Sequence, residues 1–446
     1  MAIPSPGCSK PPPAAIAGTL LNETMRWEEP GLPAVDRRVL TYVPTAGKES
    51  APMPLVLVFH GWGGGPHLYH EKFTFGKLAE EAGFLAVYPE GLSDVHGAWY
   101  PKRSWNTGDT TVEKIDAPTE VCDPKEVTAK GVCYQSCIIK YGKCKKCSWT
   151  TCYDDFAFIM KLLDDVEKRY CIDLSSVFAY GCSNGGVFAH ALARKAPGKF
   201  KAIAAGCGAK PHRGYETNFT AGGEPVSMVL FQGGEDWTIP AKTPKPHARW
   251  WDGYIYASDT AVRKAYKDYN KCSNQGPRPF VQPPHVHSQQ MSCTEYGYDC
   301  AENSKVVECE FRGGHDLVLG LGANEIMDGP ELAWNFFCEQ AQLRENCRMR
   351  QYVSLKLHWL APHGLRKGAD PLSADAGFSM MGLRLPMILA FASVLCLLNL
   401  LLLWAHRRSM RCGHFSPVQT REEVEESPPA ALGCKTTSPV GASEQP

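Results

Sequence analysis

The chain has 446 residues, of which 44% are hydrophobic and 21% are charged. This composition is that of an ordinary globular protein and excludes a largely disordered chain. Lys and Arg together number 47, as do Asp and Glu, so the formal net charge is zero. A chain without a basic excess lacks the electrostatic signature of a nucleic-acid-binding protein. The 19 cysteines are unusual, and they indicate either an oxidising compartment or a metal site.

Beyond a Pro-rich leader at residues 1–35, the predicted elements alternate between strands and helices. Short apolar runs predict strands that are buried on both faces, and apolar residues at helical spacing predict amphipathic helices. The predicted strands are residues 39–43, 55–59, 84–88, 177–180, 228–231 and 306–311, and the predicted helices are 72–83, 155–170, 187–196 and 331–339. This alternation predicts an α/β fold over residues 36–347, with a mainly parallel, doubly wound sheet.

A cysteine-rich insertion at residues 109–153 interrupts this pattern. Its cysteines are Cys122, Cys133, Cys137, Cys144, Cys147 and Cys152. Four thiolates could hold zinc, and the C-x-x-C at Cys144 and Cys147 is of the appropriate kind. The spacing is otherwise irregular and no second C-x-x-C follows. We therefore expect no metal, and instead disulfides that staple a segment with little core of its own.

The C-terminal part of the chain contains a segment typical of membrane proteins. The 20 residues from Leu385 to Trp404 carry no charge, which predicts a transmembrane helix. Arg407 and Arg408 follow it, and basic residues beside a span favour the cytosolic side. We therefore expect a juxtamembrane linker at 348–384, a disordered cytosolic tail at 405–446, and a body that lies outside the cell or in a lumen.

The N-terminal residues fit this topology poorly. The leader has only a short apolar run, residues 14–21, which makes a weak signal sequence, so a signal peptide would be cryptic or missing. The sequons that begin at Asn22 and Asn218 favour the secretory pathway, although such triplets often arise by chance. With the cysteines, they lead us to expect an extracytoplasmic body that enters the secretory pathway.

The sharpest motif is the G-x-S-x-G around Ser183, between a predicted strand and a predicted helix. In this context the turn lifts the serine hydroxyl out of the sheet edge, where it can act as a nucleophile. Gly181 and Gly185 would be required because side chains there would collide with neighbouring backbone. We therefore predict Ser183 as the nucleophile.

A nucleophilic serine needs a base and a group that orients the base. His315 follows the strand at 306–311, and Asp236 follows the strand at 228–231, so both would lie at the carboxyl edge of the sheet. Glu235 competes with Asp236 for the role of the acid. His285 and His287 stand in a Pro-rich stretch and are interpreted as surface-loop residues, with a metal pair as the alternative.

Stabilisation of an oxyanion requires backbone donors. The run from His60 to Gly65 reads His-Gly-Trp-Gly-Gly-Gly and directly follows the strand at 55–59. We predict the N–H of Trp62 as one donor and the N–H of Asn184, the residue after the nucleophile, as the other. His60 is interpreted as a structural brace of this loop.

An ordered series of motifs resembles a known family. The series comprises His60-Gly-Trp-Gly-Gly, Ser104-Trp-Asn-x-Gly, Asp154-Asp155, Tyr170-Cys-Ile-Asp, Gly181-Cys-Ser-Asn-Gly-Gly, the Asp236 loop and Gly313-Gly-His315. It is similar to the polyhydroxybutyrate depolymerase and feruloyl esterase family of secreted α/β-hydrolases, over about residues 36–345. The resemblance implies carboxylic ester hydrolysis by a triad of Ser183, Asp236 and His315. The insertion, the membrane segment and Asp316-Leu-Val-Leu-Gly after the histidine depart from the family.

We therefore expect a cofactor-free serine esterase that acts through an acyl-enzyme. Its substrate would be a polysaccharide-linked aromatic ester or a polyester, and the segment from Leu385 to Trp404 would hold it in a membrane. The alternatives are an inactive binding ectodomain and a serine peptidase or acyltransferase on the same fold.

Overall fold

The fold is described from a computed structural model of the chain. The described residues are 2–10, 16–45, 51–72, 75–95, 102–108, 110, 133–142, 149–239, 254–273, 275–280, 291–315, 319–322, 325–327 and 329–343. All of them fall in one compact unit, residues 1–361. The expected linker, membrane segment and tail lie outside the described residues. Among the residues that are described, no helix is long and apolar enough to span a bilayer.

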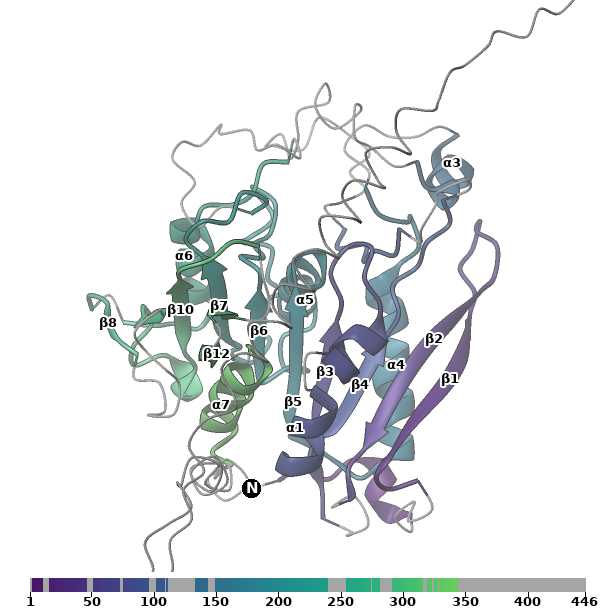
Figure 1. Ribbon diagram of the computed structural model, residues 1–446, viewed down its shortest axis with the longest axis horizontal. Helices are drawn as coiled ribbons and strands as arrows, with labels where there is room; N and C mark the ends of the chain where they lie inside the picture. The colour runs from purple at the N-terminus through teal and green to yellow at the C-terminus, as the bar shows by residue number, and fades with distance from the viewer. Residues whose placement is uncertain are drawn as a thin grey trace, which may run out of the picture. The chain divides into compact units, whose positions relative to one another are not determined.

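Within these residues a sheet of ten strands crosses the body in the order β1-β2-β4-β3-β5-β6-β7-β10-β9-β8 (Figure 1). The strands are β1 (Thr19–Trp27), β2 (Val35–Val43), β3 (Met53–Phe59), β4 (Leu85–Pro89), β5 (Ile172–Cys182), β6 (Ala202–Gly206), β7 (Ser227–Gly233), β8 (Arg278–Pro279), β9 (Met291–Glu295) and β10 (Val306–Phe311). The segment from β4 through β10 is parallel, and the pairs at both edges are antiparallel. A separate hairpin joins β11 (Leu319–Gly322) and β12 (Glu325–Met327).

Helices cover both faces of the sheet. The helices are α1 (Phe75–Ala82), α3 (Gln135–Tyr141), α4 (Asp155–Arg169), α5 (Asn184–Lys195), α6 (Asp259–Tyr269) and α7 (Gly329–Ala341), with short turns η1 (Pro6–Ser9), η3 (Leu68–Lys72) and η5 (Ala301–Asn303). One apolar layer joins α4, α5 and α6 to the sheet, and a second joins α1 and α7 to its other face. The predicted doubly wound arrangement is therefore confirmed.

The central strand β3 shows why its sequence is apolar throughout. Leu55 and Leu57 belong to the layer under α4 and α5, whereas Val56 and Val58 belong to the layer under α1 and α7. All seven residues of β3 are buried. A strand that contributes to two cores has no face left for polar side chains, which explains the continuous run.

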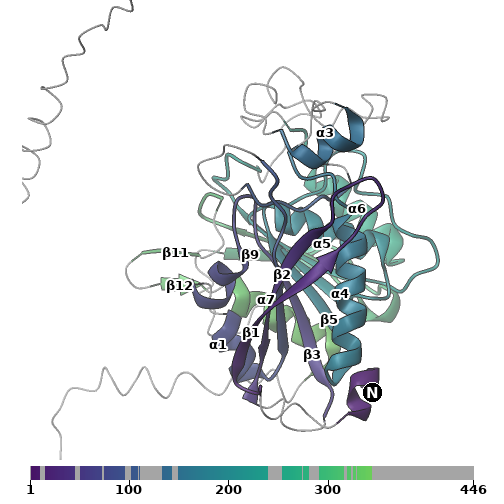
Figure 2. The ribbon, with the colours of Figure 1, turned by 90° about the vertical axis from the view of Figure 1, so that its right-hand side faces the viewer.

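The segment predicted as a leader is in part a component of the fold. Strand β1 pairs along its whole length with β2, and a disulfide joins Cys8 to Cys171. The N–H of Ile3 also donates to the Asp173 carboxylate at 2.8 Å. The predicted domain boundary at residue 36 is therefore wrong. The polar residues that alternate along β1 belong to an exposed edge strand, whose apolar content is too low to reveal it (Figure 2).

Disulfides hold the body together. Besides Cys8–Cys171, the described bonds are Cys137–Cys152, Cys182–Cys207, Cys272–Cys300 and Cys293–Cys309. Cys133 and Cys338 are also disulfide-bonded. The prediction of disulfides in the insertion is thus confirmed for Cys133, Cys137 and Cys152, and the other three cysteines of the insertion lie outside the described residues.

Candidate active site

The strained backbone of Ser183 marks the turn between β5 and α5. Its φ is 54° and its ψ is −125°, a region that residues with a side chain rarely occupy. Ser183 is half-buried, and its N–H donates to the carbonyl of Gly206 at the end of β6 (3.2 Å). The sharp turn from strand to helix therefore presents the serine at the carboxyl edge of the sheet.

Two glycines make this turn possible, as the motif predicted. A Cβ on Gly181 would lie 2.2 Å from the carbonyl oxygen of Gly185. A Cβ on Gly185 would lie 2.3 Å from the carbonyl oxygen of Phe59, the last residue of β3. Helix α5 thus begins against the end of the neighbouring strand, at a distance that only glycine allows.

Asp236 and His315 are hydrogen-bonded to each other across 79 residues of sequence. The imidazole Nδ1 of His315 lies 2.8 Å from Oδ2 of Asp236. The aspartate side chain is fully buried, and the histidine side chain is 24% exposed. The second oxygen, Oδ1, accepts from the N–H groups of Thr238 and Ile239, which fixes the carboxylate. With Nδ1 donating to a carboxylate, Nε2 is the nitrogen left to accept a proton.

Glu235 occupies a different environment. Its side chain is 66% exposed and lies 3.8 Å from Arg312 in an ion pair. It also lines a cavity of about 660 Å³ on the outer strands β7, β10 and β9. The hydrogen bond to His315 is made by Asp236, whereas the side chain of Glu235 pairs with Arg312.

The three triad candidates and the loop after β3 share one edge of the sheet. Ser183 follows β5, Asp236 follows β7 and His315 follows β10, and these strands run parallel through β6. A Cβ on Gly61, which follows β3, would lie 3.4 Å from the Cβ of Ser183. The loop with Trp62 is therefore beside the serine, as an oxyanion-binding loop requires.

His60 braces this loop rather than facing solvent. It is fully buried, and Nε2 accepts from the N–H of Gly91 (2.9 Å) while Nδ1 donates to the carbonyl of Gly61 (2.8 Å). These two bonds use both nitrogens of a neutral imidazole. Burial lowers the pKa of His60 to about 4, so the ring is neutral at physiological pH.

Asn184 is held by a buried tryptophan. Its side-chain oxygen accepts from the N–H of Trp105 (2.7 Å), and its side-chain nitrogen donates to the Trp105 carbonyl (3.0 Å). The indole of Trp105 donates in turn to the carbonyl of His60. No backbone acceptor is found among the described residues for the N–H groups of Asn184 and Trp62.

Two histidines considered in the sequence cannot be placed, and one disulfide beside Ser183 was not predicted. His285 and His287 lie outside the described residues. Sequence reasoning missed the disulfide between Cys182 and Cys207, which joins the residue before Ser183 to the end of β6. The only available signal was the position of Cys182 inside the motif, because nothing in the spacing identifies Cys207 as its partner.

The strand order and the sharp serine turn after β5 define the α/β-hydrolase fold. The prolyl oligopeptidase family matches residues 144–225, the part of the chain that holds this turn. The chain is a distant relative of the feruloyl esterase C proteins. It is 26% identical over 185 residues to the probable feruloyl esterase C of Aspergillus niger, and 27% identical over 186 residues to feruloyl esterase C of Emericella nidulans. Each match spans 41% of this chain and 57% of the relative.

Solved structures of esterases also match. An acetyl xylan esterase from Aspergillus awamori is 14% identical, with a TM-score of 0.41, and the match covers 67% of this chain and 94% of that chain. A ferulic acid esterase is 12% identical, with a TM-score of 0.39, and the match covers 75% and 99%.

Proposed function

We propose that this protein is a serine carboxylic ester hydrolase that acts through an acyl-enzyme. The hydrogen bond between His315 and Asp236, at the same sheet edge as the Ser183 turn, is the observation that carries the proposal. A buried acid that orients a histidine, at the sheet edge where a serine occupies a sharp strand–helix turn, is the arrangement expected for nucleophilic acyl transfer.

Each residue has a distinct role in the proposed reaction. The Ser183 hydroxyl attacks the ester carbonyl and gives its proton to Nε2 of His315. The N–H groups of Trp62 and Asn184 stabilise the oxyanion of the tetrahedral intermediate. His315 then protonates the departing alcohol, which leaves an acyl-serine. Water, deprotonated by His315, releases the acid and restores the serine. Asp236 keeps the imidazole in the required tautomer throughout and stabilises its charged form.

We propose a polysaccharide-linked aromatic ester as the substrate class, with a polyester as the second candidate. The relationship to feruloyl esterase C supports the first. A peptidase or acyltransferase is the competing reaction, and the match of residues 144–225 to the prolyl oligopeptidase family favours a peptidase test. An inactive binding ectodomain is the least consistent alternative, since the histidine–acid pair is intact.

The disulfides and the relationship to feruloyl esterases point to the secretory pathway. We propose further that the body is extracellular or lumenal and that the segment from Leu385 to Trp404 anchors it in the membrane. The sequence pattern of that segment is the support for an anchor.

The test is a comparison of the wild type with Ser183→Ala on methyl ferulate, short p-nitrophenyl esters, polyhydroxybutyrate and a peptide amide. We expect ester turnover in the wild type, and in the variant only the residual ~10³–10⁴-fold acceleration over water that such sites retain without their nucleophile. A fluorophosphonate should label the wild type alone. Equal labelling of both proteins would refute the nucleophile, and faster cleavage of the amide than of any ester would favour the peptidase.

A further inference from the structure

The cysteine-rich insertion holds the side chain of Trp62, the residue whose N–H is proposed as an oxyanion donor. The indole Nε1 of Trp62 donates to the hydroxyl of Tyr134 and to the carbonyl of Trp149, both at 3.0 Å. The ammonium of Lys102 lies 4.7 Å from the centroid of the same ring. Both acceptors come from the insertion, so this segment determines where the indole lies.

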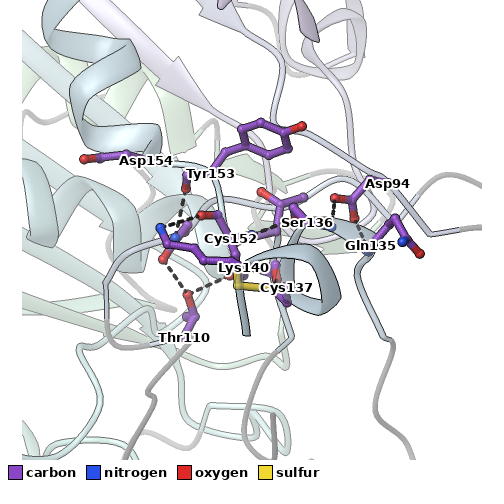
Figure 3. The surroundings of a disulfide bond; sticks show 12 residues. Asp94, Thr110, Gln135, Ser136, Cys137, Lys140, Cys152, Tyr153 and Asp154 are labelled. Atoms are coloured by element: carbon purple, nitrogen blue, oxygen red, sulfur yellow. Dashed lines mark hydrogen bonds between the residues drawn. A yellow bond between two sulfur atoms is a disulfide. The ribbon is translucent and has the colours of Figure 1, made fainter. Parts of the chain in front are cut away.

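Tyr134 is itself firmly placed. It is 1% exposed, and its hydroxyl donates to the carbonyl of Lys102 (2.7 Å). The same hydroxyl therefore connects Trp62 to the segment that precedes the insertion. Helix α3 begins directly after it. The carboxylate of Asp94 accepts from the N–H groups of Gln135 and Ser136 and thereby caps that helix (Figure 3).

A disulfide unites the two parts of the insertion that contact Trp62. Cys137 on α3 is bonded to Cys152, and the N–H of Cys152 donates to the hydroxyl of Ser136 at 2.9 Å (Figure 3). Both cysteines are buried. The segment with Tyr134 and the segment with Trp149 are therefore one unit, although residues outside the described range separate them in sequence.

The backbone around Trp62 is fixed on either side of its N–H. The N–H of Gly61 donates to the Tyr69 hydroxyl (3.3 Å), and the N–H of Gly63 donates to the carbonyl of Arg103 (2.7 Å). The two indole bonds to the insertion restrain the side chain of the same residue. A donor aimed in advance at the developing oxyanion contributes more to catalysis than one that must reorient.

We propose that Tyr134 is a positioning residue of the active site, through which the disulfide-bonded insertion orients the Trp62 N–H toward the oxyanion. This inference rests on the proposed function. It assigns to the insertion a part in the reaction itself.

The test is Tyr134→Phe, which removes the hydroxyl that accepts from the indole. Loss of an oxyanion donor costs about 10²–10³-fold in kcat, and misorientation of a donor costs less, so we expect a fall in kcat of about tenfold with little change in KM. Trp62→Phe should give a similar fall. The double variant should lose no more than Trp62→Phe alone, because removal of the indole N–H already breaks its bond to Tyr134.

Tyr153→Phe is the matched control. Its hydroxyl donates to the carbonyl of Pro33 (2.8 Å), and it lies beside the same disulfide (Figure 3). Among the described residues, no hydrogen bond joins the Tyr153 hydroxyl to the Trp62 loop. We expect its kcat to equal that of the wild type. Thermal unfolding of all variants identifies any that fail to fold, and an equal fall in kcat for Tyr153→Phe would show that general loosening of the insertion is the cause.

Fluorophosphonate labelling separates this inference from the proposed function, since the phosphonyl oxygen uses the same donors without needing an ester substrate. Slower labelling of Tyr134→Phe than of Tyr153→Phe would support the inference even if no ester is turned over. Equal labelling rates and equal kcat would overturn it while leaving the esterase proposal intact. A wild-type protein that reacts with neither reagent would overturn both proposals.

Discussion

At the scale of single residues, the acid beside His315 is the most direct test of the proposed triad. Asp236→Asn should leave the fold intact and lower kcat by about 10⁴-fold, because an amide favours the wrong tautomer of the imidazole. Glu235→Gln is the control, since this exposed carboxylate pairs with Arg312. Steady-state kinetics on one ester would compare the two variants. A large loss in Glu235→Gln with none in Asp236→Asn would reverse the assignment.

His60 should make the fold sensitive to mild acid. The unfolded chain binds a proton at this residue near pH 6.5, whereas the folded protein does so only near pH 4. The unfolded state therefore gains protons first as the pH falls, and the free energy of unfolding should drop by about 2 kcal/mol between pH 7 and pH 5.

The control for this prediction is His60→Gln, whose amide can donate and accept but does not titrate. Urea unfolding at both pH values should show a smaller dependence on pH in the variant. An identical dependence in both proteins would mean that other groups cause the acid sensitivity.

At the scale of elements, one buried ion pair joins the antiparallel edge of the sheet to helix α4. Arg37 on β2 lies 2.7 Å from Asp155, and neither side chain is exposed. The guanidinium also lies 3.9 Å from the ring centroid of Phe158. Burial raises the pKa of Asp155, and the charge of Arg37 opposes that rise.

Asp155→Ala should destabilise the protein by about 3–5 kcal/mol, because it leaves the Arg37 charge buried without a counter-charge. The double variant Arg37→Met with Asp155→Ala should be more stable than Asp155→Ala alone, since it removes the stranded charge. Urea unfolding of the three proteins measures both effects. If the double variant is the least stable, packing rather than charge dominates at this site.

Some helices and strands were predictable from the sequence, and others were not. Strands β3 and β4 were predictable because they are continuous apolar runs. Strand β6 was missed because its Ala and Gly residues lack the β-branched side chains that mark a strand, although the strand is fully buried. Helix α6 was missed despite a recognisable beginning, in which the Ser258 hydroxyl accepts from the N–H of Ala261.

The site was predictable to the extent that its chemistry is encoded in short motifs. Ser183 and its glycines lie within five residues, and their conformation follows from local sterics. The bond from Trp62 to Tyr134 joins residues 72 positions apart through a segment without regular spacing. No local pattern encodes such a contact, because it depends on tertiary structure between residues far apart in the sequence.

At the scale of the whole molecule, the proposed membrane anchor and its orientation can be measured directly. The basic residues after Trp404 predict a cytosolic C-terminus. In sealed microsomes we therefore expect the body to resist protease while a tag placed after Pro446 is removed. Detergent should render both sensitive, and a digested body with a protected tag would refute the orientation.

Formation of the disulfide between Cys182 and Cys207 depends on the compartment in which the protein folds. It attaches the residue before Ser183 to the neighbouring strand end, so the bend that exposes the serine is secured by a covalent link. Thiols stay reduced in the cytosol, and a chain retained there would lack that link. If the protein is exported as proposed, this covalent link beside Ser183 would form only after the chain enters the oxidising secretory pathway.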